Sequence, residues 1–206
     1  MSLIVHHLNN SRSQRVLWLL EELSLPYEIR HYQRDPVTNL APEDLKAIHP
    51  LGKSPLLEDD SVVIQESAAI VQHLIDSYGK GRFAPAATDA LRHLQFMHFA
   101  EGSAMTPILL QLYTSRLGDS AAPLRPRIDE QLQSHFAYME NELRSSGHFV
   151  GDDWTGADVM LSFPAEIAVM QGAGSTYPKL ADFVTRVHAL PAWQRAREKG
   201  GAYYGF

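Results

Sequence analysis

The chain has 206 residues, 45% of them hydrophobic and 20% charged, with a formal net charge of −6, a composition typical of a folded protein with one large domain or two small ones. The absence of cysteine excludes disulfides, thiolate metal sites and a protein thiol as nucleophile, and the negative charge argues against nucleic acid as a partner. Because no signal-peptide pattern and no apolar run of roughly 18 residues occurs, we expect a cytoplasmic protein without a transmembrane segment.

Residues 1–79 alternate between strand and helix patterns. Short apolar runs predict strands at 2–8, 27–32, 55–57 and 62–64, the last two forming a hairpin. Apolar residues at three- and four-residue spacing predict helices at 12–23, 41–48 and 66–78. Ser11 and Gln14 fit a capping box at the start of the first helix. This order predicts an α/β domain built on a small mixed sheet.

Residues 80–86 interrupt all periodicity and are the predicted linker. Beyond them no strand pattern occurs, and helices are predicted at 89–116, 126–144, 178–188 and 191–198, with a further one beginning at Trp154. A kink is expected at Pro107, inside the first of these helices. Thr155 and Asp158 match a capping box with an acid in the glutamate position. Residues 87–206 are therefore predicted to form an all-α helical bundle.

The stretch 51–74 holds residues that suit a small peptide ligand. Glu66 and Ser67 open a helix, whose positive N-terminus suits a carboxylate, while Glu66 can accept from an ammonium group. Lys53 lies in a loop and can meet a second carboxylate. When each residue is taken alone, routine helix capping and a solvated surface lysine are the simpler interpretations.

The dipeptide Ser54-Pro55 stands at the mouth of a predicted strand. A cis bond there would turn the Ser54 backbone N–H and C=O outward, where an extended peptide can pair with them. From the dipeptide alone, an ordinary trans proline at a strand start is favoured, because few X-Pro bonds are cis.

Ser11 follows the first predicted strand, at the start of the first helix. Donors at a helix N-terminus lower the pKa of a thiol, so Ser11 suits a ligand held as a thiolate. A role as N-cap alone explains Ser11 equally well, and the two roles are compatible. Because the chain has no cysteine, any such thiol belongs to a ligand. The aromatic C-terminus, residues 203–206, fits either a cap over an apolar pocket or a terminus docked on the core.

In their order and spacing, these signals resemble the cytosolic glutathione transferase family over nearly the whole chain. The segments that carry the resemblance are NSRSQR at 10–15, LWLLEE at 17–22, HPLGKSPLL at 49–57, QESAAI at 65–70, AEGS at 100–103 and the Thr155–Asp158 box. The chain is most similar to serine-type fungal and bacterial members that are grouped with a yeast membrane-associated transferase. The resemblance implies a thioredoxin-like N-terminal domain and an all-α helical-bundle C-terminal domain.

The resemblance also implies which residues bind glutathione. In this family the residue before a cis-proline holds the cysteinyl part through its backbone, a role that falls to Ser54 before Pro55. By the same resemblance, Glu66 and Ser67 bind the γ-glutamyl end of glutathione, and Lys53 binds its glycine carboxylate. These roles agree with the charges. The two carboxylates of glutathione meet the anion sites at Ser67 and Lys53, and its ammonium group meets the Glu66 carboxylate.

Serine-type members place the catalytic serine four residues before the arginine of the first helix. Counting back from Arg15 gives Ser11. No tyrosine stands in this loop, so the tyrosine-type arrangement does not apply. Ser13, Asn10 and backbone N–H groups remain alternative donors to the thiolate.

The implied reaction is attack by the glutathione thiolate on a hydrophobic electrophile or a peroxide. It takes place in an apolar pocket between the domains, with Asn10, Met105 and Tyr113 as candidate lining residues. A homodimer is implied, in which Glu101 reaches the neighbouring subunit's glutathione. Glutathione is the co-substrate, and no metal is expected, because the ten histidines are scattered without an H-E-x-x-H motif. The alternatives are a non-catalytic glutathione-binding or scaffold protein and a glutathione-dependent lyase, dehalogenase or isomerase.

Overall fold

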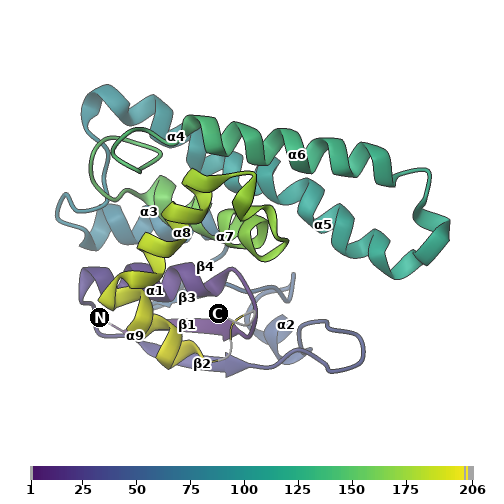
Figure 1. Ribbon diagram of the computed structural model, residues 1–206. Helices are drawn as coiled ribbons and strands as arrows, with labels where there is room; N and C mark the ends of the chain where they lie inside the picture. Colours follow the sequence, from purple (N-terminus) through teal and green to yellow (C-terminus); the bar gives the residue numbers. More distant parts are fainter. Residues whose placement is uncertain (1, 202, 204–206) are drawn as a thin grey trace. The chain divides into compact units, whose positions relative to one another are not determined.

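The computed structural model describes residues 2–201 and 203, and the chain divides into two compact units (Figure 1). Unit 1 comprises Met1–Ala84 together with His188–Phe206, and unit 2 comprises Pro85–Val187. Strands occur only in unit 1 among the described residues, so the predicted change from mixed to all-helical structure is confirmed.

The sheet of unit 1 has four strands in the order β2-β1-β3-β4. Its strands are β1 (Leu3–Leu8), β2 (Glu28–Tyr32), β3 (Leu56–Asp59) and β4 (Val62–Ile64). β1 runs parallel to β2 and antiparallel to β3, which pairs with β4 as a hairpin. The predicted small mixed sheet is therefore present. Its topology and helices are those of a thioredoxin-like domain.

The helices of unit 1 are α1 (Ser13–Leu23), α2 (Asp44–Ile48), α3 (Ser67–Tyr78) and α9 (Pro191–Gly200). α1 contacts β1, α3 and α9, so almost every face of it is covered. This explains why Val16, Leu17, Trp18, Leu19 and Leu20 are all fully buried, although only some of them share one helical face.

α9 packs beside α1, although the sequence assigned all of 87–206 to the helical bundle (Figure 1). The carboxylate of Glu21, which is 7% exposed, accepts a hydrogen bond from Arg195 Nε at 2.8 Å and another from Lys199. Tyr27 Oη donates to the same carboxylate at 2.7 Å. Trp193 is also buried. The buried Trp193 side chain and the hydrogen bonds that Arg195 and Lys199 donate to the Glu21 carboxylate therefore hold α9 on the rest of unit 1.

Replacing Glu21 with glutamine is expected to lower the free energy of unfolding by about 2 kcal/mol, because charge-assisted hydrogen bonds are lost. Burial works to raise the pKa of Glu21, but hydrogen bonds from Lys199, Tyr27 and Arg195 outweigh it and hold the pKa below its usual value. The stabilisation is thus present at neutral pH and is lost as pH falls through the folded-state pKa. Denaturant melts at several pH values measure this.

The matched control is Glu28→Gln, because the Glu28 side chain is 65% exposed and its nearest ion-pair partner lies 3.9 Å away. That variant is expected to stay within about 0.5 kcal/mol of wild type. Equal stability of the two variants at neutral pH would contradict the role given to Glu21.

Unit 2 is built from helices. They are α4 (Ala90–Phe99), a π-helical turn (Ala100–Ala104), α5 (Met105–Thr114), α6 (Arg125–Glu142), α7 (Gly156–Met170) and α8 (Pro178–Ala189), with 3₁₀ turns at Ala87–Asp89, Ser115–Ala121 and Ala173–Ser175. The helix predicted at 89–116 is interrupted by this π-helical turn, and Pro107, where a kink is expected, lies just beyond it in α5. Proline removes the hydrogen bond to the residue four positions earlier, Ser103, which lies in that turn. The capping box of Thr155 and Asp158 at the start of α7 is confirmed.

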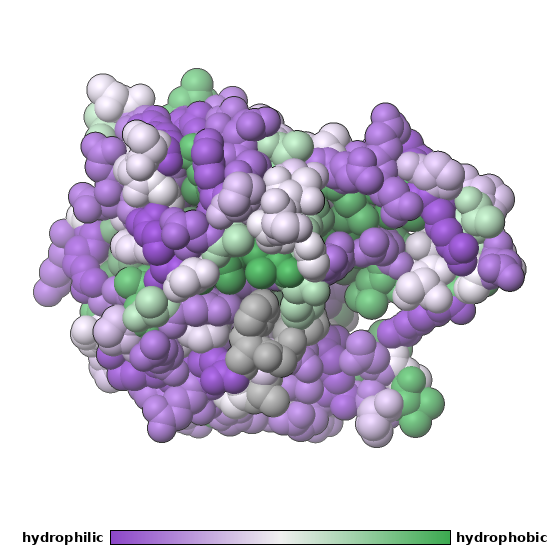
Figure 2. All heavy atoms as spheres, viewed as in Figure 1, coloured by the Kyte–Doolittle hydropathy of each residue, from purple (hydrophilic) through white to green (hydrophobic). Residues whose placement is uncertain are grey.

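No helix within the described part of the chain is long and apolar enough to cross a membrane. Hydrophilic residues predominate on the face drawn in Figure 2, where hydrophobic residues are exposed in small groups.

Candidate functional site

Strand register brings three separate segments to one edge of the sheet. β1 is antiparallel to β3 with His6 opposite Leu56, and β3 is antiparallel to β4 with Leu57 opposite Ile64. The end of β1, the start of β3 and the end of β4 therefore lie side by side. The predicted residues at 10–13, 53–55 and 66–67 directly continue these strand ends, so the fold gathers them.

Ser54 ties the first two segments together. Its Oγ donates to the carbonyl of His6 at 2.8 Å and accepts from the backbone N–H of Leu8 at 3.2 Å. The Ser54–Pro55 bond is cis, so the trans interpretation favoured by the dipeptide alone is wrong. The backbone N–H and C=O of Ser54 make no hydrogen bond to another backbone group of the described residues. They are available to an extended ligand.

Glu66 and Ser67 stand at the N-terminus of α3, which has 12 residues. Ser67 is 4% exposed, whereas Glu66 is exposed. Glu66 has a φ of 68°, a region that residues other than glycine seldom adopt. No side chain caps this helix among the residues that the structure covers, so routine capping does not account for the pair. The uncapped N–H groups favour an anion, and the Glu66 carboxylate favours a cation beside it.

Lys53 is exposed next to Ser54. It has no ion pair with any described residue, so its charge is available at this edge of the sheet.

Ser11 is 5% exposed and lies at the start of α1. Its Oγ accepts from the backbone N–H of Ser13 at 3.2 Å and lies 2.7 Å from Ser13 Oγ. The predicted capping box with Gln14 is wrong, because the Gln14 side-chain amide has no hydrogen-bond partner in the described structure. The hydrogen-bond partner of the Ser11 side chain is Ser13 instead of Gln14. The Ser13 hydroxyl continues to His7 Nδ1 at 2.8 Å, a contact that no local pattern indicates.

The loop between β1 and α1 is held by Arg34, which sequence reasoning missed. The backbone N–H of Arg34 donates to Asn9 Oδ1 at 2.8 Å, and its guanidinium donates to the carbonyls of Asn9, Asn10 and Asn39, each at 3.1 Å. Asn10 has a φ of 48°, which asparagine tolerates better than most residues. No sequence signal links Arg34 to this loop, because the two lie more than twenty residues apart and pair only after β2 docks on β1.

The three candidates from the helical part lie in unit 2. Glu101 is half-buried in the π-helical turn. Met105 is 2% exposed and Tyr113 is 60% exposed on α5. Their roles toward an electrophile or a neighbouring subunit stay predictions.

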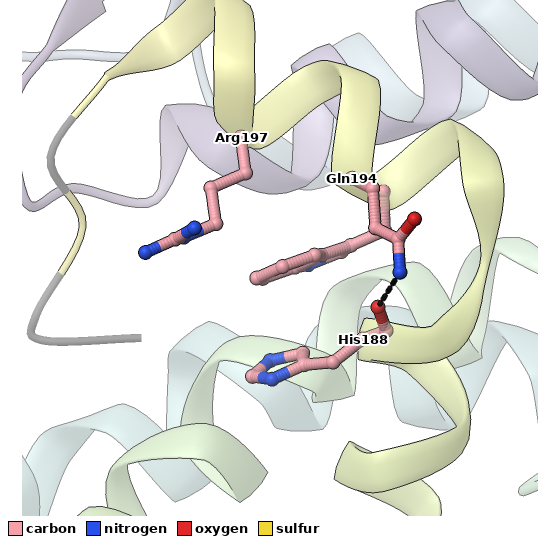
Figure 3. A pocket seen from close by; sticks show the side chains of 4 residues that line it. His188, Gln194 and Arg197 are labelled. Atoms are coloured by element: carbon pink, nitrogen blue, oxygen red, sulfur yellow. Dashed lines mark hydrogen bonds between the residues drawn. The ribbon is translucent and has the colours of Figure 1, made fainter.

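A cavity of about 360 Å³ is lined by none of the predicted residues (Figure 3). Its lining is His188, Trp193, Gln194 and Arg197. The rings of His188 and Trp193 stack 3.9 Å apart, and Gln194 Nε2 donates to the His188 carbonyl at 3.3 Å. Tyr203 is buried near Trp193, consistent with a docked terminus, while residues 204–206 of the predicted aromatic tail lie outside the described residues.

Within the described residues no group of three or more His, Asp or Glu side chains is placed to hold a metal ion. The sheet edge where these segments meet instead offers two positions for an anion, at Lys53 and at the N-terminus of α3. It also offers the carboxylate of Glu66 and the backbone N–H and C=O of Ser54. Such a set suits an extended ligand with two carboxylates and an ammonium group.

Comparison with known proteins assigns both parts of the chain to one family. Residues 11–77 match the family model of the glutathione S-transferase N-terminal domain, and residues 88–191 match that of the C-terminal domain. Glutathione S-transferase 3 of Schizosaccharomyces pombe is 34% identical over 215 residues, covering 96% of this chain and 87% of the relative.

Two solved structures extend the likeness to the fold. A glutathione S-transferase from Actinobacillus pleuropneumoniae superposes with a TM-score of 0.88 at 34% identity, covering 98% of this chain and 94% of that one. A glutathione transferase homologue from Sulfitobacter, with bound glutathione, has a TM-score of 0.83 at 21% identity and covers 97% and 98% of the two chains.

Proposed function

The chain belongs to the glutathione S-transferase family and is a glutathione transferase, and we propose that it holds glutathione along the sheet edge formed by residues 53–55 and 66–67. The observation that carries this proposal is the strand register. It pairs His6 with Leu56 and Leu57 with Ile64, so the segments that follow β1 and β4 and the segment that precedes β3 leave the same edge of the sheet, where the Leu8 N–H also donates to Ser54 Oγ. Relatives of this fold have been solved with glutathione bound.

Each part of glutathione meets a group of matching chemistry. The γ-glutamyl carboxylate binds Ser67 and the uncapped N–H groups of α3, and the ammonium group binds the exposed carboxylate of Glu66. The cysteinyl backbone pairs with the N–H and C=O of Ser54 beside Pro55. The glycine carboxylate binds Lys53, whose charge has no ion-pair partner among the described residues.

Ser11 donates a hydrogen bond to the sulfur and favours the thiolate over the thiol. A free thiol has a pKa of about 8.5, so hydrogen bonding to the charged form raises the thiolate fraction at neutral pH. The thiolate then attacks an electrophilic carbon, forming a C–S bond as the leaving group departs with its electron pair. With a peroxide it attacks one oxygen, so that an S–O bond forms, the O–O bond breaks and the other oxygen leaves as the alcohol, and a second glutathione then displaces water from the sulfenic acid to give glutathione disulfide. The thiol proton passes to solvent.

The remaining parts of the proposal concern the helical residues and the assembly. Residues 80–86 link the domains, and the helical domain supplies the apolar surface for the electrophile, with Tyr113 and Met105 as contributors alongside Asn10. The protein forms a homodimer in which Glu101 approaches the other subunit's glutathione, and it acts in the cytoplasm. Retention on immobilised glutathione and conjugation of a general aryl halide test the transferase; binding without turnover of any electrophile or peroxide would favour a scaffold.

Ser67→Ala is expected to raise the Kd for glutathione about tenfold, because one hydrogen bond to a carboxylate is lost. The matched control is Ser77→Ala on the same helix, whose exposed hydroxyl makes only a 3.4 Å contact with His73. Isothermal titration with glutathione measures both variants. An unchanged Kd in Ser67→Ala would remove Ser67 from the γ-glutamyl site.

A further inference from the structure

Arg34 holds two consecutive carbonyl groups of the loop that joins β1 to α1. Its Nε donates to the carbonyl of Asn9 and its Nη2 donates to the carbonyl of Asn10, each at 3.1 Å. Its backbone N–H donates to Asn9 Oδ1 at 2.8 Å. A guanidinium only donates and a carbonyl only accepts, so the direction of these hydrogen bonds is fixed.

Arg34 lies on the β2 side of this loop. It follows shortly after Tyr32, the last residue of β2, whose carbonyl accepts the N–H of Asn9 at 3.1 Å. The other side of the loop faces β3, because the N–H of Leu8 donates to Ser54 Oγ at 3.2 Å. The strand order β2-β1-β3-β4 agrees with these contacts. The loop therefore has Arg34 on one side and the segment 53–55 on the other.

The two carbonyls fix the direction of the N–H group that follows them. Successive carbonyls of an extended strand point to opposite sides, but Asn10 has a φ of 48°, and this left-handed conformation accompanies the turn of both carbonyls toward Arg34. The Asn10–Ser11 peptide bond is trans, and in a trans peptide the N–H points away from the C=O. The Ser11 N–H is therefore directed away from Arg34, toward the side on which Ser54 lies.

This N–H group has no acceptor within the part of the chain that the structure describes. Ser11 precedes α1, and its N–H donates to no backbone or side-chain atom there. Ser11 is only 5% exposed. Because buried backbone N–H groups are nearly always paired, this one favours an acceptor supplied by a ligand.

We propose that Arg34 is a positioning residue which, by holding the carbonyls of Asn9 and Asn10, aims the Ser11 N–H at the sulfur of bound glutathione. This role rests on the proposed function, which places the thiol beside Ser11. The guanidinium at the Asn10 carbonyl also polarises the Asn10–Ser11 peptide, so the N–H is a stronger donor. Two donors, the N–H and the hydroxyl of Ser11, then lower the pKa of the bound thiol further than the hydroxyl does alone.

Arg34→Lys separates geometry from charge. Lysine keeps the positive charge, but its ammonium group is a compact point charge and does not reproduce the fork of Nε and Nη2 on two carbonyls. The pKa of the bound thiol is read from the ultraviolet absorbance of the thiolate, on the full-length protein saturated with glutathione. Arg34→Lys is expected to raise that pKa by about one unit.

The matched control is Arg30→Lys on β2, because the Arg30 side chain is 48% exposed and its nearest ion-pair partner lies 3.9 Å away. It is expected to leave the thiol pKa within about 0.3 unit of wild type. A purely structural Arg34 lowers the melting temperature without moving the thiol pKa. That result overturns the role given to Arg34, and a raised thiol pKa in Ser11→Ala beside it leaves the proposed function standing.

The Ser11→Ala background tests whether Arg34 acts through the N–H or through the hydroxyl. Alanine keeps the backbone N–H, so adding Arg34→Lys to Ser11→Ala is expected to raise the thiol pKa again by about one unit. If Arg34 only keeps the hydroxyl in place, its replacement has no effect once the hydroxyl is gone. Loss of the effect in the double variant therefore overturns the proposal.

A measurement on the wild-type chain decides the question even if Arg34→Lys fails to fold. In protein labelled with ¹⁵N-serine, the Ser11 amide proton is expected to move downfield as the thiol of bound glutathione ionises. S-methylglutathione forms no thiolate and should leave that proton in place over the same pH range. An identical pH response with both ligands overturns the proposal. If the wild-type chain does not bind glutathione, the proposed function is wrong as well.

Discussion

Replacing Asp158 with alanine is expected to lower the free energy of unfolding by about 4 kcal/mol, a large share of a typical domain's stability. Asp158 is 0% exposed. Its carboxylate accepts the backbone N–H groups of Phe149 and Thr155, each at 2.8 Å, and the Thr155 hydroxyl at 2.9 Å. Alanine leaves buried donors without an acceptor, at a cost of about 1–3 kcal/mol each.

The charge state of Asp158 supports this expectation. Burial raises the pKa of Asp158 to about 6, against the effect of the donors from Phe149 and Thr155. At pH 7 the group is therefore mainly a carboxylate that accepts every hydrogen bond offered. Asp158→Asn keeps the size but turns one acceptor into a donor facing another donor, so a loss of about 2 kcal/mol is expected.

Urea denaturation at pH 7 measures the Asp158 variants against Asp153→Ala. Asp153 is exposed before the same helix, and its removal is expected to change stability by less than about 0.5 kcal/mol. Similar stability of Asp158→Ala and Asp153→Ala would mean that the capping box contributes nothing to the helical unit.

Ser11→Ala is expected to lower kcat/KM for conjugation by about 100-fold, the usual effect of losing one preorganised donor to a developing or resident anion. The bound thiol pKa should rise in parallel, because the thiolate loses its hydrogen bond. The Kd for total glutathione should change little, since Ser67, Glu66 and Lys53 bind the ends of the tripeptide. Steady-state kinetics across pH, together with the thiol titration, measure these effects.

The control is Ser61→Ala, which removes an exposed hydroxyl in the β3–β4 turn and should leave kinetics unchanged. A wild-type rate in Ser11→Ala would reduce Ser11 to an acceptor for the Ser13 N–H. The thiolate donor would then be sought among Asn10 and the backbone N–H groups of the loop.

Local patterns were sufficient for most elements of the fold. Strands and helices follow from hydrophobic periodicity, and the Thr155–Asp158 box marks the start of α7 because capping requires only residues three apart. The same kind of pattern misled at Ser11 and Gln14, where the partner of Ser11 is Ser13. It also misplaced the last helix, because the acid that anchors α9 is Glu21, more than 170 residues earlier.

The sequence by itself determined which chemical groups the site contains and the elements on which they stand. A serine before α1, a lysine before the Ser54-Pro55 dipeptide and a Glu-Ser pair at a helix start all follow from local spacing. Only the tertiary structure decided that they share one edge of the sheet, that the Ser54–Pro55 bond is cis and that His7 stands behind Ser13. The reason is physical: backbone periodicity is set by neighbouring residues, whereas strand register and buried hydrogen-bond partners depend on packing between segments far apart in the chain.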